Sequence, residues 1–166
     1  MAPRVNLRTG IGYDVHPFDA VRPLYLGGVR IEGAPGLAGH SDADALLHAI
    51  IDALLGAAAL GDIGRHFPPG DPAYKDIDSK KLLAQTATLL RENGVAVQNI
   101  DSTIVAETPR LQSHLDAMRQ AIASVLGIDA ARVNVKATSP EGLGALGRSE
   151  GIAALAVALV TIEDES

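Results

Sequence analysis

The segment DADALLHAIIDALLGAAAL, residues 42–60, decides the fold class, because its large apolar residues recur with helical spacing. Those residues are Leu46, Leu47, Ile50, Ile51, Leu54 and Leu55. The pattern predicts a helix from about Asp42 to Leu60, with Ser41 or Asp42 as its N-cap. We expect the leucines and isoleucines to hold this helix in the core.

Strands are predicted on the N-terminal side of this helix. The run Arg4–Tyr13 has β-branched and aromatic residues and leads to Pro17, so it reads as a strand that ends at a proline-marked turn. Residues Leu24–Ile31 contain Gly27-Gly28 between apolar runs, which is typical of a hairpin. A Gly/Pro loop at 33–39 then leads to the helix.

Helices and strands alternate on the C-terminal side. We expect helices at Ser79–Asn93, capped by Asp78 and closed by Gly94, and at Leu111–Leu126, ended by Gly127. We expect strands at Val95–Glu107, Arg132–Thr138 and Ile152–Glu163. The loop Gly61–Ile77 has a length typical of functional or mobile segments, and Ser139–Gly147 is a second, glycine-rich loop.

This alternation, without a repeat or a linker, predicts one domain over residues 1–166. We expect an α+β fold of the two-layer α/β type, in which helices pack on one face of a mixed β-sheet.

The composition excludes several classes of protein. A net charge of −6 and an aromatic content of 3% argue against a nucleic-acid binder, which needs basic and stacking surfaces. The most apolar segment carries Asp44, His48 and Asp52, too many ionisable groups for a membrane span. The chain has no cysteine, so a zinc site must use histidines and carboxylates. Residues 1–9 lack the apolar core of a signal peptide, and we expect a cytoplasmic protein.

Asp14, His16 and His48 are candidate metal ligands. Asp14 and His16 lie two residues apart at the predicted end of a strand, so their side chains share a face. One carboxylate and two imidazoles suit a zinc ion with an open fourth position. Asp44 and Asp52 lie four residues before and after His48 and suit supporting contacts to it. The alternatives are a turn aspartate with ordinary histidines, and a charged helix stripe.

The residues just before the helix suit anion binding. Ser41 and Asp42 are natural N-caps, and His40 can add a hydrogen bond to a phosphate or hydroxyl at the helix N-terminus. A loop histidine without a function is the alternative.

The glycine-rich loop suits a diphosphate. Residues 142–147 match G-x-G-x-x-G, but a strand is expected to follow, which excludes a dinucleotide-binding unit. Ser139, Glu141 and Arg148 offer a hydroxyl, a carboxylate for a divalent cation and a guanidinium. The alternative is a hairpin-like connection with solvent-facing charges. Residues 61–71 suit a lid and the backbone of 106–111 suits a base edge, although both also read as plain connections.

Six motifs run in order along nearly the whole chain. They are GYDVH at 12–16, GHSDAD at 39–44 with His48, DALLG at 52–56, GDIGRHFP at 61–68, VKAT at 135–138 and GRSEGI at 147–152. The chain therefore resembles the 2-C-methyl-D-erythritol 2,4-cyclodiphosphate synthase family of the non-mevalonate isoprenoid pathway. The resemblance implies a homotrimer that converts 4-diphosphocytidyl-2-C-methyl-D-erythritol 2-phosphate to the cyclodiphosphate and CMP at sites between subunits.

The resemblance also implies roles for residues. It implies one Zn²⁺ per subunit on Asp14, His16 and His48. Because a protonated histidine cannot bind zinc, we expect zinc affinity to fall below about pH 6. It implies Mg²⁺ or Mn²⁺ on the diphosphate through Glu141, and transition-state stabilisation by His40 and Ser139. The implied substrate-binding residues include Asp14, His16, His40 and Ser41, and on the erythritol-side loop Asp62, Ile63, Gly64, Phe67 and Asp71. The implied nucleotide-side and phosphate residues are Ala106, Pro109, Arg110, Leu111, Gln112, Thr138, Ser139, Glu141 and Arg148, and Ala145 corresponds to an axial position.

Two other functions compete with this interpretation. A zinc hydrolase would use the same three ligands to activate water, but it does not need a diphosphate loop. A non-catalytic trimeric protein that binds isoprenoid phosphates would bind ligand without releasing CMP.

Overall fold

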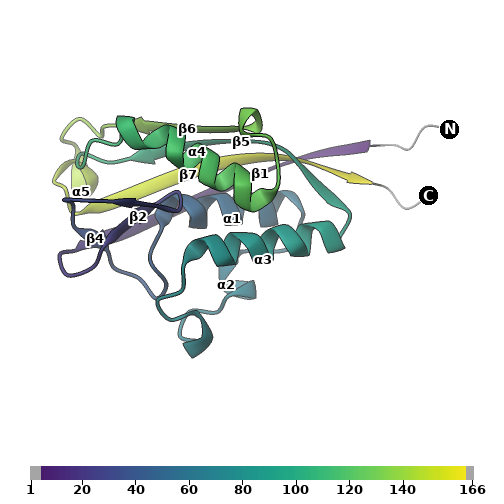
Figure 1. Ribbon diagram of the computed structural model, residues 1–166, viewed down its shortest axis with the longest axis horizontal. Helices are drawn as coiled ribbons and strands as arrows, with labels where there is room; N and C mark the ends of the chain where they lie inside the picture. Colours follow the sequence, from purple (N-terminus) through teal and green to yellow (C-terminus); the bar gives the residue numbers. More distant parts are fainter. Residues whose placement is uncertain (1–4, 164–166) are drawn as a thin grey trace.

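The computed structural model describes residues 5–163, which build a mixed β-sheet with helices on one face (Figure 1). The sheet has the strand order β4-β1-β7-β5-β6. Its strands are β1 (Val5–Asp19), β4 (Gly36–Leu37), β5 (Val95–Val105), β6 (Val133–Thr138) and β7 (Gly151–Glu163). The β5–β6 pair is parallel and the other pairs are antiparallel. A separate hairpin joins β2 (Leu24–Leu26) to β3 (Val29–Ile31).

Three long helices supply the second layer. They are α1 (Ala45–Ala57), α3 (Ser79–Glu92) and α4 (Leu115–Leu126). Helix α1 packs on β1 and β7, α4 packs on β6, and α3 contacts both other helices. The short helical segments are α2 (Ile63–His66), α5 (Gly144–Gly147), η1 (Pro72–Tyr74), η2 (Gln112–His114) and η3 (Ala130–Arg132). The predicted α+β architecture is confirmed.

The two faces of the sheet differ in burial. On the helix face, Ala154, Ala156 and Ala158 of β7 are buried under α1. The opposite face leaves large apolar side chains of β1 and β7 exposed to solvent. They are Leu7, Ile11, Tyr13, Val15, Leu155 and Val157.

The first strand is longer than predicted. It continues through Pro17, which pairs with Gly151 of β7, and ends at Asp19 instead of near Tyr13. Proline is tolerated because β4 pairs with β1 only at Phe18 and Asp19, so no neighbouring strand needs the missing N–H of residue 17. The predicted start at Arg4 lies outside the described residues.

The first long helix is shorter than predicted. Ala43 has a left-handed backbone with φ of 58°, which excludes residues 42 and 43 from the helix. Asp44 is the N-cap in place of Ser41 or Asp42, and its carboxylate accepts a hydrogen bond from the Leu47 N–H. The helix ends at Ala57, because Ala59 is again left-handed.

The loops are more ordered than their composition suggests. Residues 61–77 contain α2 and η1, and the glycine-rich loop ends in α5. The helix predicted from Leu111 begins at Leu115, after the separate turn η2. The predicted ends at Asp78, Gly94 and Gly127 agree with the structure. Among the described residues, no helix combines the length and apolar character that a membrane crossing requires.

Candidate active site

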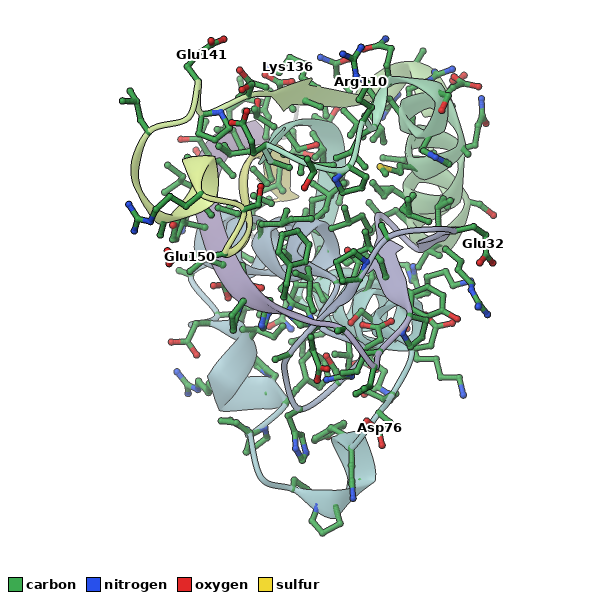
Figure 2. The ribbon with its side chains drawn as sticks, turned by 90° about the vertical axis from the view of Figure 1, so that its left-hand side faces the viewer. Glu32, Asp76, Arg110, Lys136, Glu141 and Glu150 are labelled. Carbon is green, nitrogen blue, oxygen red and sulfur yellow. The ribbon has the colours of Figure 1, made fainter. Side chains whose placement is uncertain are left out.

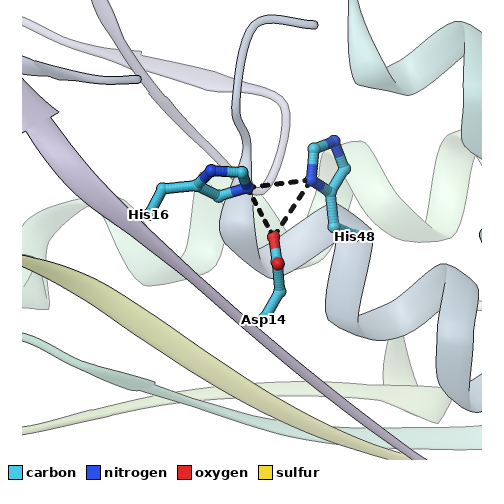
Figure 3. A group of neighbouring side chains, drawn as sticks. All are labelled: Asp14, His16 and His48. Carbon is cyan, nitrogen blue, oxygen red and sulfur yellow. Dashed lines mark hydrogen bonds and ion pairs between the residues drawn. The ribbon is translucent and has the colours of Figure 1, made fainter. Parts of the chain in front are cut away.

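The side chains of Asp14, His16 and His48 converge at one point (Figure 3). Asp14 Oδ2 lies 2.7 Å from His16 Nε2 and 3.0 Å from His48 Nδ1. The two imidazole nitrogens are 3.3 Å apart. All three ligand atoms lie within 4.8 Å of one another, so the three residues that the sequence singles out form one cluster.

The packing of α1 on β1 brings the cluster together. Asp14 and His16 alternate with outward-facing residues of β1, so both point toward the helix layer. His48 lies in the first turns of α1, above these two side chains. A β-carbon at Gly10 or Gly12 would overlap carbonyl oxygens of α1, so only glycine allows this close approach of strand and helix.

The cluster carries linked charges. Burial opposes ionisation of Asp14, but hydrogen bonds from His16 and His48 outweigh it and lower the pKa of Asp14 to about 2. Burial also opposes protonation of His16, but the hydrogen bond and charge of Asp14, helped by the Ala38 carbonyl, raise the pKa of His16 above 6.5. The cluster thus favours a protonated His16 beside an ionised Asp14.

The donor set fits a metal ion. His16 Nδ1 lies 2.8 Å from the carbonyl oxygen of Ala38, which can only accept a hydrogen bond. Nδ1 therefore carries the hydrogen when the ring is neutral, and Nε2 turns its lone pair toward Asp14 and His48. Two imidazole nitrogens and one carboxylate oxygen are ligands that divalent transition metals accept, with a fourth position left for another ligand.

The carboxylates of Asp44 and Asp52 hydrogen-bond to backbone groups and not to the His48 ring, although the charges of Asp52 and His48 interact. The fully buried carboxylate of Asp44 accepts hydrogen bonds from the N–H groups of Gly27, Gly28 and Leu47. Asp52 accepts from the N–H of Ile63. Both carboxylates satisfy backbone N–H groups. These partners cannot be predicted from the spacing of residues along one helix.

A cavity of about 240 Å³ opens beside the cluster. Its lining combines the three candidate ligands with five other residues predicted to bind substrate, and with further residues of α1, α3 and residues 61–77. The lining residues are Asp14, His16, His40, Ser41, His48, Asp52, Ile63, Gly64, Phe67, Pro69, Tyr74 and Leu82.

Two other residues predicted for this side act as caps. Asp62 caps α2 by accepting from the Arg65 N–H, and Asp71 caps η1 by accepting from the Ala73 N–H. The Asp71 carbonyl also lies 2.8 Å from His40 Nε2, which ties residues 61–77 to the mouth of the cavity.

A second cavity of about 380 Å³ gathers the predicted nucleotide-side residues. Its lining residues are Ala106, Glu107, Pro109, Arg110, Leu111, Gln112, Ala137, Thr138 and Ser139. The sequence does not single out the side chain of Glu107, whose carboxylate accepts hydrogen bonds from the Ser139 hydroxyl and the Gly142 N–H. The two cavities share no lining residue.

Glu141, Ala145 and Arg148 line neither of these two cavities. Glu141 is exposed, donates its N–H to the Ser139 hydroxyl and extends outward from the loop after β6 (Figure 2). Arg148 pairs with Glu150 at 2.7 Å on the surface. Within one chain, therefore, Ser139 and Glu141 are brought together, whereas Arg148 is held elsewhere.

Two further residues near the cluster escaped prediction. Arg22 donates to the carbonyl oxygens of Gly39 and Ser41, on either side of His40. Ser79, fully buried at the start of α3, lies 3.0 Å from His48 Nε2. In the sequence, Asp78-Ser79 indicates only the start of a helix. No sequence pattern indicated the contacts of Ser79 or Arg22.

Comparisons with known proteins assign the chain to a family. The model of the YgbB family matches residues 7–161. A 2-C-methyl-D-erythritol 2,4-cyclodiphosphate synthase of Thermosynechococcus vestitus is 56% identical over 94% of this chain and 97% of its own length.

Solved structures have the same fold. The bifunctional IspDF protein from Campylobacter jejuni matches with a TM-score of 0.93 and 44% identity, over 98% of this chain and 44% of that one. The Plasmodium falciparum IspF structure, a CDP complex, matches with a TM-score of 0.83 and 30% identity, over 96% of this chain and 98% of that one. This chain therefore belongs to the YgbB family, together with the 2-C-methyl-D-erythritol 2,4-cyclodiphosphate synthases that it matches along nearly its whole length.

Proposed function

We propose that this enzyme converts 4-diphosphocytidyl-2-C-methyl-D-erythritol 2-phosphate to 2-C-methyl-D-erythritol 2,4-cyclodiphosphate and CMP, a step of non-mevalonate isoprenoid biosynthesis. The observation that carries the proposal is the Asp14–His16–His48 cluster at the edge of a cavity, in a chain 56% identical to a synthase of that name. The CDP bound to the Plasmodium falciparum relative supports a cytidine nucleotide as ligand.

The reaction needs charge neutralisation and alignment more than covalent help from the protein. An oxygen of the 2-phosphate attacks the β-phosphorus, and the bond from that phosphorus to the oxygen bridging the α-phosphate breaks. The electron pair leaves with CMP, and the ring closes. Effective catalysis of such a transfer comes mainly from positioning and electrostatic stabilisation.

We propose that Asp14, His16 and His48 hold one Zn²⁺ per subunit. When bound, the ion supplies positive charge that neutralises and aligns phosphate oxygens. Glu141 is the proposed carboxylate for Mg²⁺ or Mn²⁺ on the diphosphate. It is exposed in the loop after β6 and bonds to Ser139, which lines the second cavity. His40 and Ser139 are the proposed donors to the transition state, because each lines one of the two cavities.

We propose that the active assembly is a homotrimer, with each site shared between subunits. The support is twofold: the two cavities share no lining residue, and β1 and β7 expose an apolar face of the sheet. Contiguous exposed apolar surfaces of this kind mark association sites. A cytoplasmic location remains a prediction from the sequence.

Product analysis tests the function. The purified protein, with zinc and magnesium, is incubated with the diphosphocytidyl substrate and followed by ³¹P NMR and nucleotide chromatography. The proposal predicts equal amounts of cyclic diphosphate and CMP. A ring-opened phosphate product would support the hydrolase, and binding without CMP release would support a non-catalytic protein. Either outcome contradicts the proposal.

A further inference from the structure

His48 uses its two ring nitrogens for different partners. Nδ1 faces the cluster, 3.0 Å from Asp14 Oδ2. Nε2 faces away from it, 3.0 Å from the Ser79 hydroxyl and 3.1 Å from the Ser41 hydroxyl. A neutral imidazole carries one hydrogen, so the partners of Nε2 decide which nitrogen keeps a lone pair for a metal ion.

Ser79 is committed to a carboxylate on its other side. Its hydroxyl lies 2.5 Å from Asp42 Oδ1, and its backbone N–H lies 2.9 Å from Asp42 Oδ2. A serine has a single hydroxyl hydrogen, and a carboxylate can only accept. The hydroxyl of Ser79 therefore donates to Asp42, and its oxygen is left to accept a hydrogen bond from His48.

The resulting chain of hydrogen bonds has one direction. His48 Nε2–H donates to Ser79, and Ser79 donates to Asp42. Asp42 is itself fixed, because its Oδ1 also accepts from the N–H of Asp44. When a metal ion takes the place of the hydrogen bond between His48 and Asp14, a hydrogen on Nε2 leaves the lone pair of Nδ1 free to bind the ion.

We infer that Asp42 and Ser79 are positioning residues, which hold His48 in the orientation and tautomer that bind a metal ion through Nδ1. The inference rests on the metal site of the proposed function. It corrects the sequence-based reading of Asp42 as a helix cap and gives Ser79 a role beyond the start of α3. Outer partners of this kind orient ligand histidines and make them more basic.

The geometry favours Ser79 over Ser41 as the acceptor that fixes the ring. The Ser41 oxygen lies 3.1 Å from Nε2 and also accepts from the Ala43 N–H, and within residues 5–163 its hydroxyl makes no hydrogen bond to a carboxylate. Ser79 is fully buried and bonded to Asp42 through both its backbone and its side chain. His48, the proposed ligand on α1, is thus held by Ser79, the first residue of α3.

Zinc affinity of four variants tests the inference. Ser79→Ala removes the acceptor. Asp42→Asn keeps the shape of the side chain but replaces one carboxylate oxygen with an NH₂ group. That NH₂ group must face an N–H or O–H group whose hydrogen bond the oxygen accepted. The double variant combines both changes. Asp78→Ala removes the neighbouring cap of α3 and leaves the chain of hydrogen bonds intact. Each metal-free protein is titrated with zinc against a chromophoric chelator, and circular dichroism verifies the fold.

Each single substitution on the chain of hydrogen bonds should weaken zinc binding by roughly 10–100-fold. The zinc affinity of the double variant should be only slightly lower than that of the weaker-binding single variant, because both residues act through one chain of hydrogen bonds. The Asp78→Ala protein should bind zinc like the wild type.

Three results would overturn the inference. Wild-type affinity in Ser79→Ala or Asp42→Asn would overturn it and leave the proposed zinc site standing. Losses that multiply in the double variant would mean that the two residues act independently. A wild-type protein that binds no zinc would remove both the inference and the proposed metal site.

Discussion

Gly12 of β1 lies directly beneath the carbonyl oxygen of Ala49 in α1, and a β-carbon at Gly12 would overlap that oxygen. The contact sets the separation of strand and helix next to the cluster. Asp14 is two residues beyond Gly12, and His48 directly precedes Ala49. The distance between the strand ligands and the helix ligand is therefore fixed by the absence of a side chain at Gly12.

Gly12→Ala should destabilise the fold and weaken zinc binding together. The added methyl must push α1 away from β1, and overpacking of this kind costs about 1–3 kcal/mol or more. Chemical denaturation and zinc titration of the metal-free protein measure both effects. Gly56→Ala is the matched control, because its β-carbon finds only Ile11 O at 4.0 Å in the same interface. That helical substitution should stabilise by about 0.5–1 kcal/mol. Unchanged zinc affinity in Gly12→Ala would contradict the account.

Zinc affinity should fall as the pH falls through the pKa of His16. A protonated imidazole cannot bind a metal, and the pKa of His16 is raised above 6.5 by the hydrogen bond of Asp14, against the effect of burial. The fall should thus begin above the pH of about 6 expected from unperturbed histidines. Each displaced proton should contribute about a tenfold loss per pH unit. Chelator competition between roughly pH 5 and 8 measures the slope, and an affinity independent of pH in that range would refute the prediction.

The metal-free protein should show a different pH dependence of stability. The raised pKa of His16 stabilises the fold below 6.5, and this contribution is lost as the pH rises through the folded-state pKa. The lowered pKa of Asp14 stabilises the fold above 3.8, and this contribution is lost as the pH falls toward 2. The contribution of the pair should therefore be largest between these two limits. Urea denaturation across this range tests it, and a stability that rises steadily above pH 6.5 in metal-free protein would contradict the assignment for His16.

Glu141→Gln should impair CMP release and leave zinc content nearly unchanged. The carboxylate is exposed and lines neither cavity, so its loss does not disturb Asp14, His16 or His48. Loss of one electrostatic contact to the transition state typically costs roughly 10²–10³-fold in rate. The assay is CMP release at limiting magnesium, with zinc measured on the same preparation. Full activity at limiting magnesium would remove Glu141 from the mechanism.

Ile11→Asp should dissociate the proposed trimer and abolish activity. Ile11 lies on the exposed apolar face opposite Val157 of β7 and is 70% exposed in the single chain. Burying three symmetry-related carboxylates in one interface is unfavourable without partners. Light scattering measures the mass. Val21→Asp, at a residue that is 91% exposed outside the strands, is the control and should stay trimeric. A stable, active wild-type monomer would contradict the trimer.

The long elements of the fold could be predicted because their signals are local. The apolar stripe of α1 and the end signals Asp78, Gly94 and Gly127 agree with the structure. The start of α1 could not be predicted, because Ser41 and Asp42 are also natural caps and stand before the observed cap Asp44. Asp44 is chosen by the hairpin glycines whose N–H groups it also accepts, and that contact is tertiary.

In the candidate site, too, some residues could be predicted from the sequence and others could not. Asp14, His16 and His48 could be found from residue type and spacing, because the metal-ligand chemistry is visible in the side chains themselves. The roles of Ser79 and Arg22 depend on how α3 and the segment after β1 pack around the cluster. Glycines 10 and 12 carry no side chain, so their part in the site appears only when α1 lies on β1.

Zinc stoichiometry tests the central claim most directly. Elemental analysis of purified wild-type protein should give one zinc per chain, and His48→Ala should lose zinc and CMP release together. The variant should keep its fold, because the buried leucines and isoleucines hold α1 in the core. A fully active wild-type preparation without zinc or a substitute metal, or a His48→Ala protein with normal zinc and turnover, would contradict the account.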